Sequence, residues 1–101
     1  MQQGYQLYVA GFLPGLVKIG YSRDPAARIR HLSSLIGVRP SKYQAFDLCD
    51  RTKGRMAERA VFKLLAAQRV GKGEFVRISY RNAVKAAASV VSEICGGDHA
   101  A

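Results

Sequence analysis

The pattern of hydrophobic and polar residues predicts a β-hairpin near the start of the chain. Leu7, Val9 and Phe12 form one apolar run, and a second run occupies residues 16–19, after a Pro-Gly pair. Two short apolar runs separated by glycine and proline are typical of neighbouring strands joined by a tight connection. The sequence therefore predicts a strand, a turn and a second strand within residues 5–21.

A helix is predicted directly after this hairpin. Asp24 is a suitable N-cap, because its carboxylate can accept from a free backbone N–H of the first turn, and Pro25 is tolerated at the first helical position. Gly37 is typical of a helix end. We expect the buried face of this helix to contain Ile29, Leu32, Leu35 and Ile36.

The remaining sequence predicts a strand, two helices and a short extended segment. Alternation over residues 43–49 indicates a third strand, and residues 53–68 and 80–95 have helical periodicity. Residues 74–78 form the extended segment. The order β-β-α-β-α-(β)-α is an α+β pattern. It predicts a small antiparallel sheet flanked by helices, with three strands, or four if the extended segment pairs.

The predicted helix over residues 53–68 has one acidic residue, Glu58, at the border of a broad apolar stripe. Arg55, Arg59 and Lys63 fall outside that stripe. At 3.6 residues per turn, the stripe contains Met56, Ala57, Ala60, Val61, Leu64 and Leu65. A carboxylate at the border of such a stripe can point into a groove over the sheet.

The length of 101 residues indicates a single domain, with a core over about residues 5–95 and a tail, residues 96–101, that we expect to be mobile. No apolar run approaches the length of a membrane span, and the N-terminus lacks the features of a signal peptide. We therefore expect a cytoplasmic protein, associated with the nucleoid if its host is bacterial. Cys49 and Cys95 are expected to be small core residues of a reducing compartment, with a bridge between them as the alternative.

The charge of the chain indicates an anionic partner. Sixteen Lys and Arg residues oppose seven Asp and Glu residues, for a formal net charge of +9. Such a charge favours nucleic acid. An anionic membrane is disfavoured, because the basic residues do not form one amphipathic block with aromatic anchors. The residues expected to contact DNA are Arg23, Arg30, Lys42, Arg51, Lys53, Arg55 and Arg59.

Four polar residues are placed by the predicted hairpin and first helix near one another. Tyr8 belongs to the first strand and Lys18 to the second, while Arg28 and His31 are one turn apart on the helix and share a face. A guanidinium binds phosphate bidentately, and an imidazole exchanges protons near neutral pH. Each residue also has a purely structural alternative. Tyr8 would be a half-buried strand tyrosine, and Lys18 and Arg28 would face solvent. Glu58 would pair with Arg55 or Lys63 on its own helix.

The order and spacing of four sequence elements resemble the GIY-YIG nuclease superfamily. Residues 7–9 (Leu-Tyr-Val) stand where the family has Gly-Ile-Tyr, and residues 18–20 (Lys-Ile-Gly) stand where it has Tyr-Ile-Gly. Arg28 follows that glycine by eight residues, as in the family, and Glu58 matches its glutamate on a later helix. Together with Gly-Glu-Phe at residues 73–75, these stretches are most similar to a short phage-associated branch of the superfamily.

This resemblance implies a GIY-YIG-like fold and a metal-dependent endonuclease that hydrolyses DNA phosphodiester bonds. Glu58 would hold one divalent cation, Mg²⁺ or Mn²⁺, Arg28 would steady the scissile phosphate, and Tyr8 would assist proton transfer. A single carboxylate suffices, because Mg²⁺ keeps several waters. Cutting both strands of a duplex would require a second copy, so a homodimer is one expectation.

Lys18 departs from the family, which has a tyrosine at that position. Its ammonium can stabilise a phosphate or lower the pKa of a neighbouring phenol. Tyr21 is the alternative source of a phenol, and His31 is an alternative base or proton donor. The rival hypothesis is a DNA-binding module that keeps the nuclease fold without cleavage.

Overall fold

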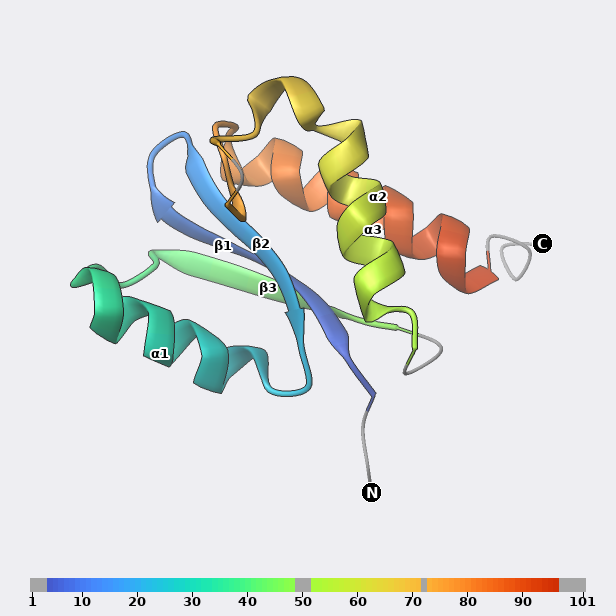
Figure 1. Ribbon diagram of the computed structural model, residues 1–101, viewed down its shortest axis with the longest axis horizontal. Helices are drawn as coiled ribbons and strands as arrows, with labels where there is room; N and C mark the ends of the chain where they lie inside the picture. Colours follow the sequence, from blue (N-terminus) through green and yellow to red (C-terminus); the bar gives the residue numbers. More distant parts are fainter. Residues whose placement is uncertain (1–3, 49–51, 72, 97–101) are drawn as a thin grey trace.

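The computed structural model of the protein describes residues 4–48, 52–71 and 73–96 (Figure 1). Within these residues, eight elements follow one another in the predicted order, and a short 3₁₀ turn is the only addition. They are β1 Gln6–Leu13, β2 Leu16–Ser22, α1 Pro25–Ile36, β3 Lys42–Asp47, α2 Gly54–Leu64, the 3₁₀ turn η1 Ala66–Gln68, β4 Phe75–Val76 and α3 Tyr80–Gly96. Cys49, Arg51 and residues 97–101 of the predicted mobile tail lie outside the described residues, whereas Gly96, which was also predicted to belong to the tail, is the last residue of α3.

The sheet has four antiparallel strands in the order β3-β1-β2-β4, so the predicted α+β class is confirmed and the extended segment does pair. Strand β4 pairs only with Val17 and Lys18 of β2. Helix α2 lies beside the other end of β2, which β4 does not cover (Figure 1). This edge is therefore where a helix can bring side chains close to the sheet. No helix in the described part of the chain is long and apolar enough to span a membrane.

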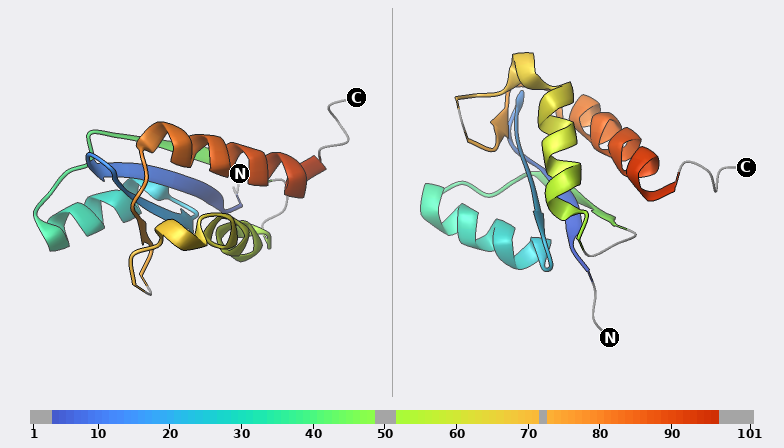
Figure 2. Two further views of the ribbon diagram at one scale, coloured as in Figure 1. Left: turned by 90° about the horizontal axis from the view of Figure 1, so that it is seen from above. Right: turned by 45° about the vertical axis from the view of Figure 1, so that its right-hand side comes forward.

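The two faces of the sheet have different cores. Leu7 and Val9 of β1, with Val17 and Ile19 of β2, pack in a cluster with residues of α2 and α3. Tyr8, Ala10 and Phe12 point to the other face and pack with Ile29 of α1. Figure 2 shows α1 and α3 on opposite sides of the sheet. The alternation of β1 thus places Tyr8 on the face that α1 covers.

The predicted start and end of α1 are confirmed. An Asp24 carboxylate oxygen accepts from the backbone N–H of Ala27 at 3.2 Å, Pro25 occupies the first turn, and Gly37 ends the helix in the left-handed region with a φ of 74°. These caps are specified by local backbone chemistry, because only the first and last turns leave backbone groups without helical partners.

The predicted buried face of α1 is wrong in its last turn. Ile29 is buried and Leu32 is half-buried, but Leu35 and Ile36 are 68% and 46% exposed. Leu35 is turned away from the side of the helix that carries Ile29, since successive residues are rotated by about 100°. Ile36 lies at the end of α1, where it lines an open apolar pocket that also includes Phe12.

Helix α2 is shorter than predicted, and a different side of it faces the core from the side that the sequence predicted. The predicted helix over residues 53–68 divides into α2 and η1, and Met56 and Leu64 are 54% and 59% exposed, against the prediction. Phe62 is buried in their place. The buried residues of α2 are Gly54, Ala57, Val61 and Phe62. This orientation turns the flank of α2 that carries Glu58 toward the sheet.

Close packing between α2 and β2 accompanies this orientation. A Cβ added to Gly54 would lie 2.5 Å from Cδ2 of Tyr21, so only glycine permits the helix to start this close to the strand. The ring of Tyr21 also meets that of Tyr5 edge-on at 5.3 Å. Tyr21 is therefore part of the contact between β2 and α2.

Candidate functional site

The Tyr8 phenol crosses over Gly20, the glycine of the Lys-Ile-Gly stretch. Tyr8 and Gly20 are direct partners in the β1–β2 register, and Tyr8 is only 1% exposed. A Cβ added to Gly20 would lie 2.7 Å from the Tyr8 oxygen and 2.8 Å from its Cζ. The space above β2 that a side chain would fill is thus occupied by the tyrosine of the neighbouring strand. Gly20 is required by this crossing and not by an unusual backbone angle.

A substitution at Gly20 tests that contact. We expect Gly20→Ala to lower the free energy of unfolding by about 1–3 kcal/mol, because the added methyl group must displace the Tyr8 ring within a packed face of the sheet. Gly73→Ala is the matched control, since a Cβ at Gly73 meets nothing within 4 Å. Urea unfolding of both variants measures the difference, and equal stabilities would show that Tyr8 moves aside without cost.

Lys18 is a buried base on the same face of β2 as Gly20. It is 5% exposed, and its ammonium forms an ion pair with Glu74, directly before β4. The ammonium also lies 5.7 Å from the centre of the Phe75 ring. An unpaired ammonium would be costly to bury, so Glu74 explains how Lys18 is accommodated. The structural alternative of a solvent-facing Lys18 is therefore wrong.

Sequence reasoning did not assign Glu74 a place in the site. Its backbone oxygen accepts from the N–H of Ile19 at 3.0 Å, which holds the residue beside β2. The sequence showed an acidic residue directly before an apolar pair in a strongly basic chain, within the Gly-Glu-Phe stretch that contributes to the family resemblance. That signal did not reveal the partner, because the pairing joins residues far apart in the sequence.

Helix α1 contributes Arg28 to the same group. Burial raises the pKa of Tyr8, while a hydrogen bond with the Arg28 side chain and its positive charge oppose that rise. Burial and the charge of Arg28 lower the pKa of Lys18 to about 8, against the opposing effect of Glu58. The ion pair with Glu74 also favours the ammonium. At neutral pH Tyr8 is therefore a neutral phenol and Lys18 is predominantly charged.

Helix α2 contributes Glu58, which is half-buried. Burial raises the pKa of its carboxyl group, and the charges of Lys18, Arg69 and Arg55 oppose that rise. The charge of Glu58 in turn acts on both Tyr8 and Lys18. Four predicted site residues from four elements thus form one electrostatic group. We call this group the polar cluster: Tyr8, Lys18, Arg28 and Glu58.

The other predicted contributors do not join the polar cluster. Tyr21 is next to Gly20 in β2 and so points to the opposite face of the sheet from Lys18 and Gly20. His31 is exposed on α1, and its imidazole makes no hydrogen bond or ion pair within the described residues. Tyr8 is therefore the phenol placed at the cluster, and a catalytic role for His31 stays a prediction.

A pocket of about 470 Å³ opens beside the polar cluster. Glu58 and Glu74 line it together with Arg59, Phe62, Lys63, Ala66 and Arg69. Among the described residues, no three His, Cys, Asp or Glu side chains are grouped so that they could hold a metal ion. A single carboxylate at an open pocket, as Glu58 provides, is compatible with Mg²⁺, for which water and substrate oxygens would supply the remaining ligands.

A model of the T5orf172 domain family matches residues 6–95. The chain belongs to this family. T5orf172 domains are phage-associated and nuclease-like, which agrees with the predicted branch at that level. No curated protein and no solved structure matches the chain.

The residues that were predicted to contact DNA are spread over this T5orf172 domain. Arg55 and Arg59 are exposed on α2, and Arg59 lines the pocket beside Glu58. Lys42 and Lys53 extend toward α3: the Lys42 ammonium lies 5.1 Å from the centre of the Tyr80 ring, and Lys53 donates to the backbone oxygen of Ile94 at 3.4 Å.

The remaining predicted DNA contacts are near α1. Arg23 lies over the ring of Tyr5 at 5.4 Å, and Arg30 is exposed at a groove of about 680 Å³ along the C-terminal half of α1. The described residues that were predicted to contact DNA are therefore distributed among β3, α1, α2 and the residues that precede the two helices. Those around the pocket, on α2, are the ones nearest to the polar cluster.

Proposed function

We propose that this T5orf172 domain is a metal-dependent endonuclease that hydrolyses DNA phosphodiester bonds. The observation that carries the proposal is the convergence of Tyr8, Lys18, Arg28 and Glu58 beside an open pocket. The chain's net charge of +9 supports a polyanionic substrate. The family match supports a nuclease-like, DNA-related role at a coarser level.

Hydrolysis of a phosphodiester requires a deprotonated nucleophile, stabilisation of the extra charge at phosphorus, and neutralisation of the leaving oxygen. Glu58 would hold a divalent cation, Mg²⁺ or Mn²⁺, which can lower the pKa of a bound water and offset negative charge. Arg28 would bind the scissile phosphate through its planar guanidinium. These two groups reach the site from α2 and α1, on either side of the end of β2.

Tyr8 and Lys18 would complete the site from the sheet. The Tyr8 phenol keeps its proton at neutral pH, because burial raises its pKa, and its oxygen accepts the hydrogen bond from the Arg28 side chain. The positive charge of Arg28 favours the phenolate when Tyr8 gives up that proton. Lys18 offers a fixed positive charge where the related nucleases have a tyrosine, and it would stabilise the charge that grows on the phosphate.

A DNA-binding module without cleavage is the second candidate. The observation that favours it concerns Lys18. This residue stands where the GIY-YIG family has the tyrosine of Tyr-Ile-Gly, and its charge is neutralised by Glu74. In this alternative, Arg28 and the exposed arginines of α2 contact phosphates, while Lys18 and Glu58 only balance the charge of the polar cluster. The two candidates make the same prediction for DNA binding and differ for cleavage.

Supercoiled plasmid, incubated with the protein in Mg²⁺, in Mn²⁺ or in EDTA, tests the proposal. We expect nicked circles with either metal and none in EDTA, with linear product appearing where a second copy cuts the opposite strand. A gel-shift assay in EDTA runs beside it. Binding without cleavage under every metal condition would establish the binding module and reject the nuclease.

DNA binding is expected to depend strongly on salt and weakly on sequence. Each neutralised phosphate adds roughly 0.9 to the slope of log affinity against log salt, so about four to six contacts would cost orders of magnitude in affinity between low and high salt. Fluorescence anisotropy with two duplexes of unrelated sequence over a salt series measures this. An affinity that hardly changed with salt would contradict the electrostatic basis of the proposal.

A further inference from the structure

Arg69 is an arginine that is held firmly at the edge of the pocket. It follows η1, and an isolated β-bridge joins it to Val76 of β4. Its guanidinium carbon lies 4.2 Å from the centre of the Phe62 ring, and its Nε donates to the backbone oxygen of Gly73 at 3.0 Å. The stacking fixes the plane of the guanidinium, and the hydrogen bond fixes its rotation within that plane.

The position of Arg69 relates it to the polar cluster. It lines the same pocket as Glu58 and Glu74, and its charge lowers the pKa of Glu58 against the effect of burial. Arg28, in contrast, acts on Tyr8 and Lys18. The two arginines therefore affect different members of the cluster, Arg28 from α1 and Arg69 from the segment after α2.

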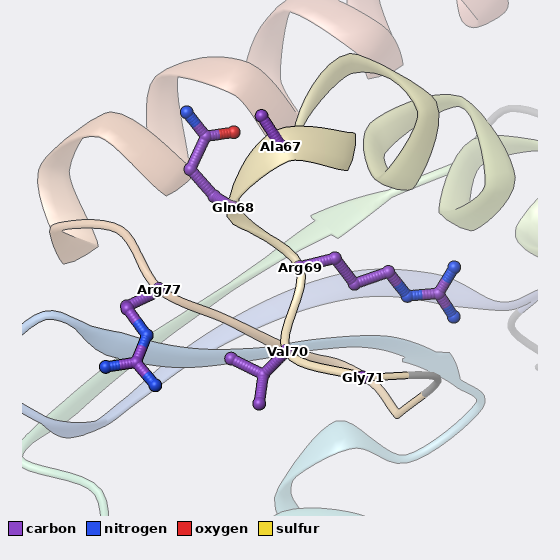
Figure 3. A pocket seen from close by; sticks show the side chains of 6 residues that line it. All are labelled: Ala67, Gln68, Arg69, Val70, Gly71 and Arg77. Atoms are coloured by element: carbon purple, nitrogen blue, oxygen red, sulfur yellow. The ribbon is translucent and has the colours of Figure 1, made fainter.

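Arg77, on the same segment, provides a comparison. Its backbone N–H donates to the oxygen of Gln68 at 2.7 Å, so the two arginines stand on paired stretches of chain. Both contribute to a second pocket of about 410 Å³. Figure 3 shows their side chains extending in opposite directions from these stretches, so that they do not converge on a shared ligand. Only Arg69 also lines the pocket that contains Glu58.

We infer that Arg69 is a second phosphate-binding residue of the site, which holds a backbone phosphate next to the scissile one. This inference rests on the proposed function for its substrate, a DNA strand. A planar guanidinium matches two phosphate oxygens at once, and one that is already fixed by Phe62 and Gly73 loses little freedom on binding. Arg28 would then hold the scissile phosphate and Arg69 a neighbouring one, in the pocket that also contains the carboxylate of Glu58.

Binding of a short fluorescent DNA duplex in EDTA, over a series of salt concentrations, tests the role of Arg69 without cleavage. We expect Arg69→Gln to weaken affinity by at least about tenfold and to reduce the salt slope by about 1. Arg77→Gln, the matched control, should weaken affinity by less than about threefold. Arg69→Lys keeps the charge but not the planar fork, so it should retain the slope and recover part of the affinity.

Thermal unfolding of the same variants separates binding from a purely structural role. Equal affinity losses for Arg69→Gln and Arg77→Gln would overturn the inference. So would a destabilised Arg69→Gln that binds DNA like the parent, or an Arg69→Lys that loses affinity and stability together. If the parent binds as expected but cuts in neither Mg²⁺ nor Mn²⁺, the nuclease proposal fails and the assignment of Arg69 as a phosphate ligand stands.

Discussion

Glu58→Gln is expected to abolish metal-dependent DNA cleavage while leaving the fold and DNA affinity nearly unchanged. Glutamine keeps the size and helix propensity of glutamate but lacks the negative charge that a hard divalent cation requires. The half-buried Glu58 has a raised pKa because burial disfavours its charged form. The neutral amide avoids that cost, so the variant loses function without an expected loss of stability.

Plasmid cleavage in Mg²⁺ and Mn²⁺, with circular dichroism and DNA binding in EDTA, measures these effects. Glu93→Gln provides the matched control, because Glu93 is exposed on α3, the helix on the other side of the sheet from α1 (Figure 2). The control should cut like the parent. Cleavage by Glu58→Gln at the parental rate would mean that the carboxylate of Glu58 does not hold the metal.

Local sequence signals predicted the part of the fold that brings the polar cluster together. The sequence predicted the two strands, the turn between them, and the presence of Tyr8 and Lys18 on these strands. The register that sets Tyr8 opposite Gly20, with an irregularity between Gly11 and Leu13, is known from the structure. The Asp24 cap fixes where α1 begins and hence where Arg28 falls on its first turns. The strands, the turn and the helix cap each depend on residues that are close in the sequence, which is why the sequence alone predicted them.

Contacts between distant segments could not be read in the same way. Glu74 and Arg69 reach the site because β4 pairs with β2 and because Arg69 pairs with Val76. Neither pairing leaves a local pattern, since β4 is only two residues long. The sequence therefore named the α1 and α2 members of the site but not the two residues on the segment around β4.

The orientation of α2 shows a second limit. Apolar residues occur around most of this helix, so periodicity allowed more than one stripe, and the one that includes Met56 and Leu64 is not the one that is buried. The choice is made by the neighbours of α2, where Gly54 contacts Tyr21 and Phe62 packs under Arg69. The predicted position of Glu58 at the border of the buried face is nevertheless confirmed, because Glu58 adjoins both the predicted and the observed stripe.

Arg28→Ala should reduce single-turnover cleavage by at least about a hundredfold, within the range for removal of one preorganised donor. Its effect on DNA affinity should stay within about tenfold. Under the proposed function, Arg28 would meet the negative charge that grows in the transition state, because its side chain hydrogen-bonds Tyr8 and its charge acts on Lys18. An interaction that is stronger in the transition state than with bound substrate lowers the rate more than the affinity when it is lost.

Arg30→Ala is the matched control for this prediction. Arg30 is two residues further along α1, is exposed as Arg28 is, and lines the separate groove that also contains Ser33 and Arg39. A phosphate contact there contributes to binding but not to the chemical step, so the variant should bind somewhat more weakly and, once bound, cut at close to the parental rate. Single-turnover rates at saturating protein, combined with affinities in EDTA, separate the two effects. If the two variants behaved alike in both assays, Arg28 would be one more phosphate-facing charge, and the DNA-binding module would become the better account of this domain.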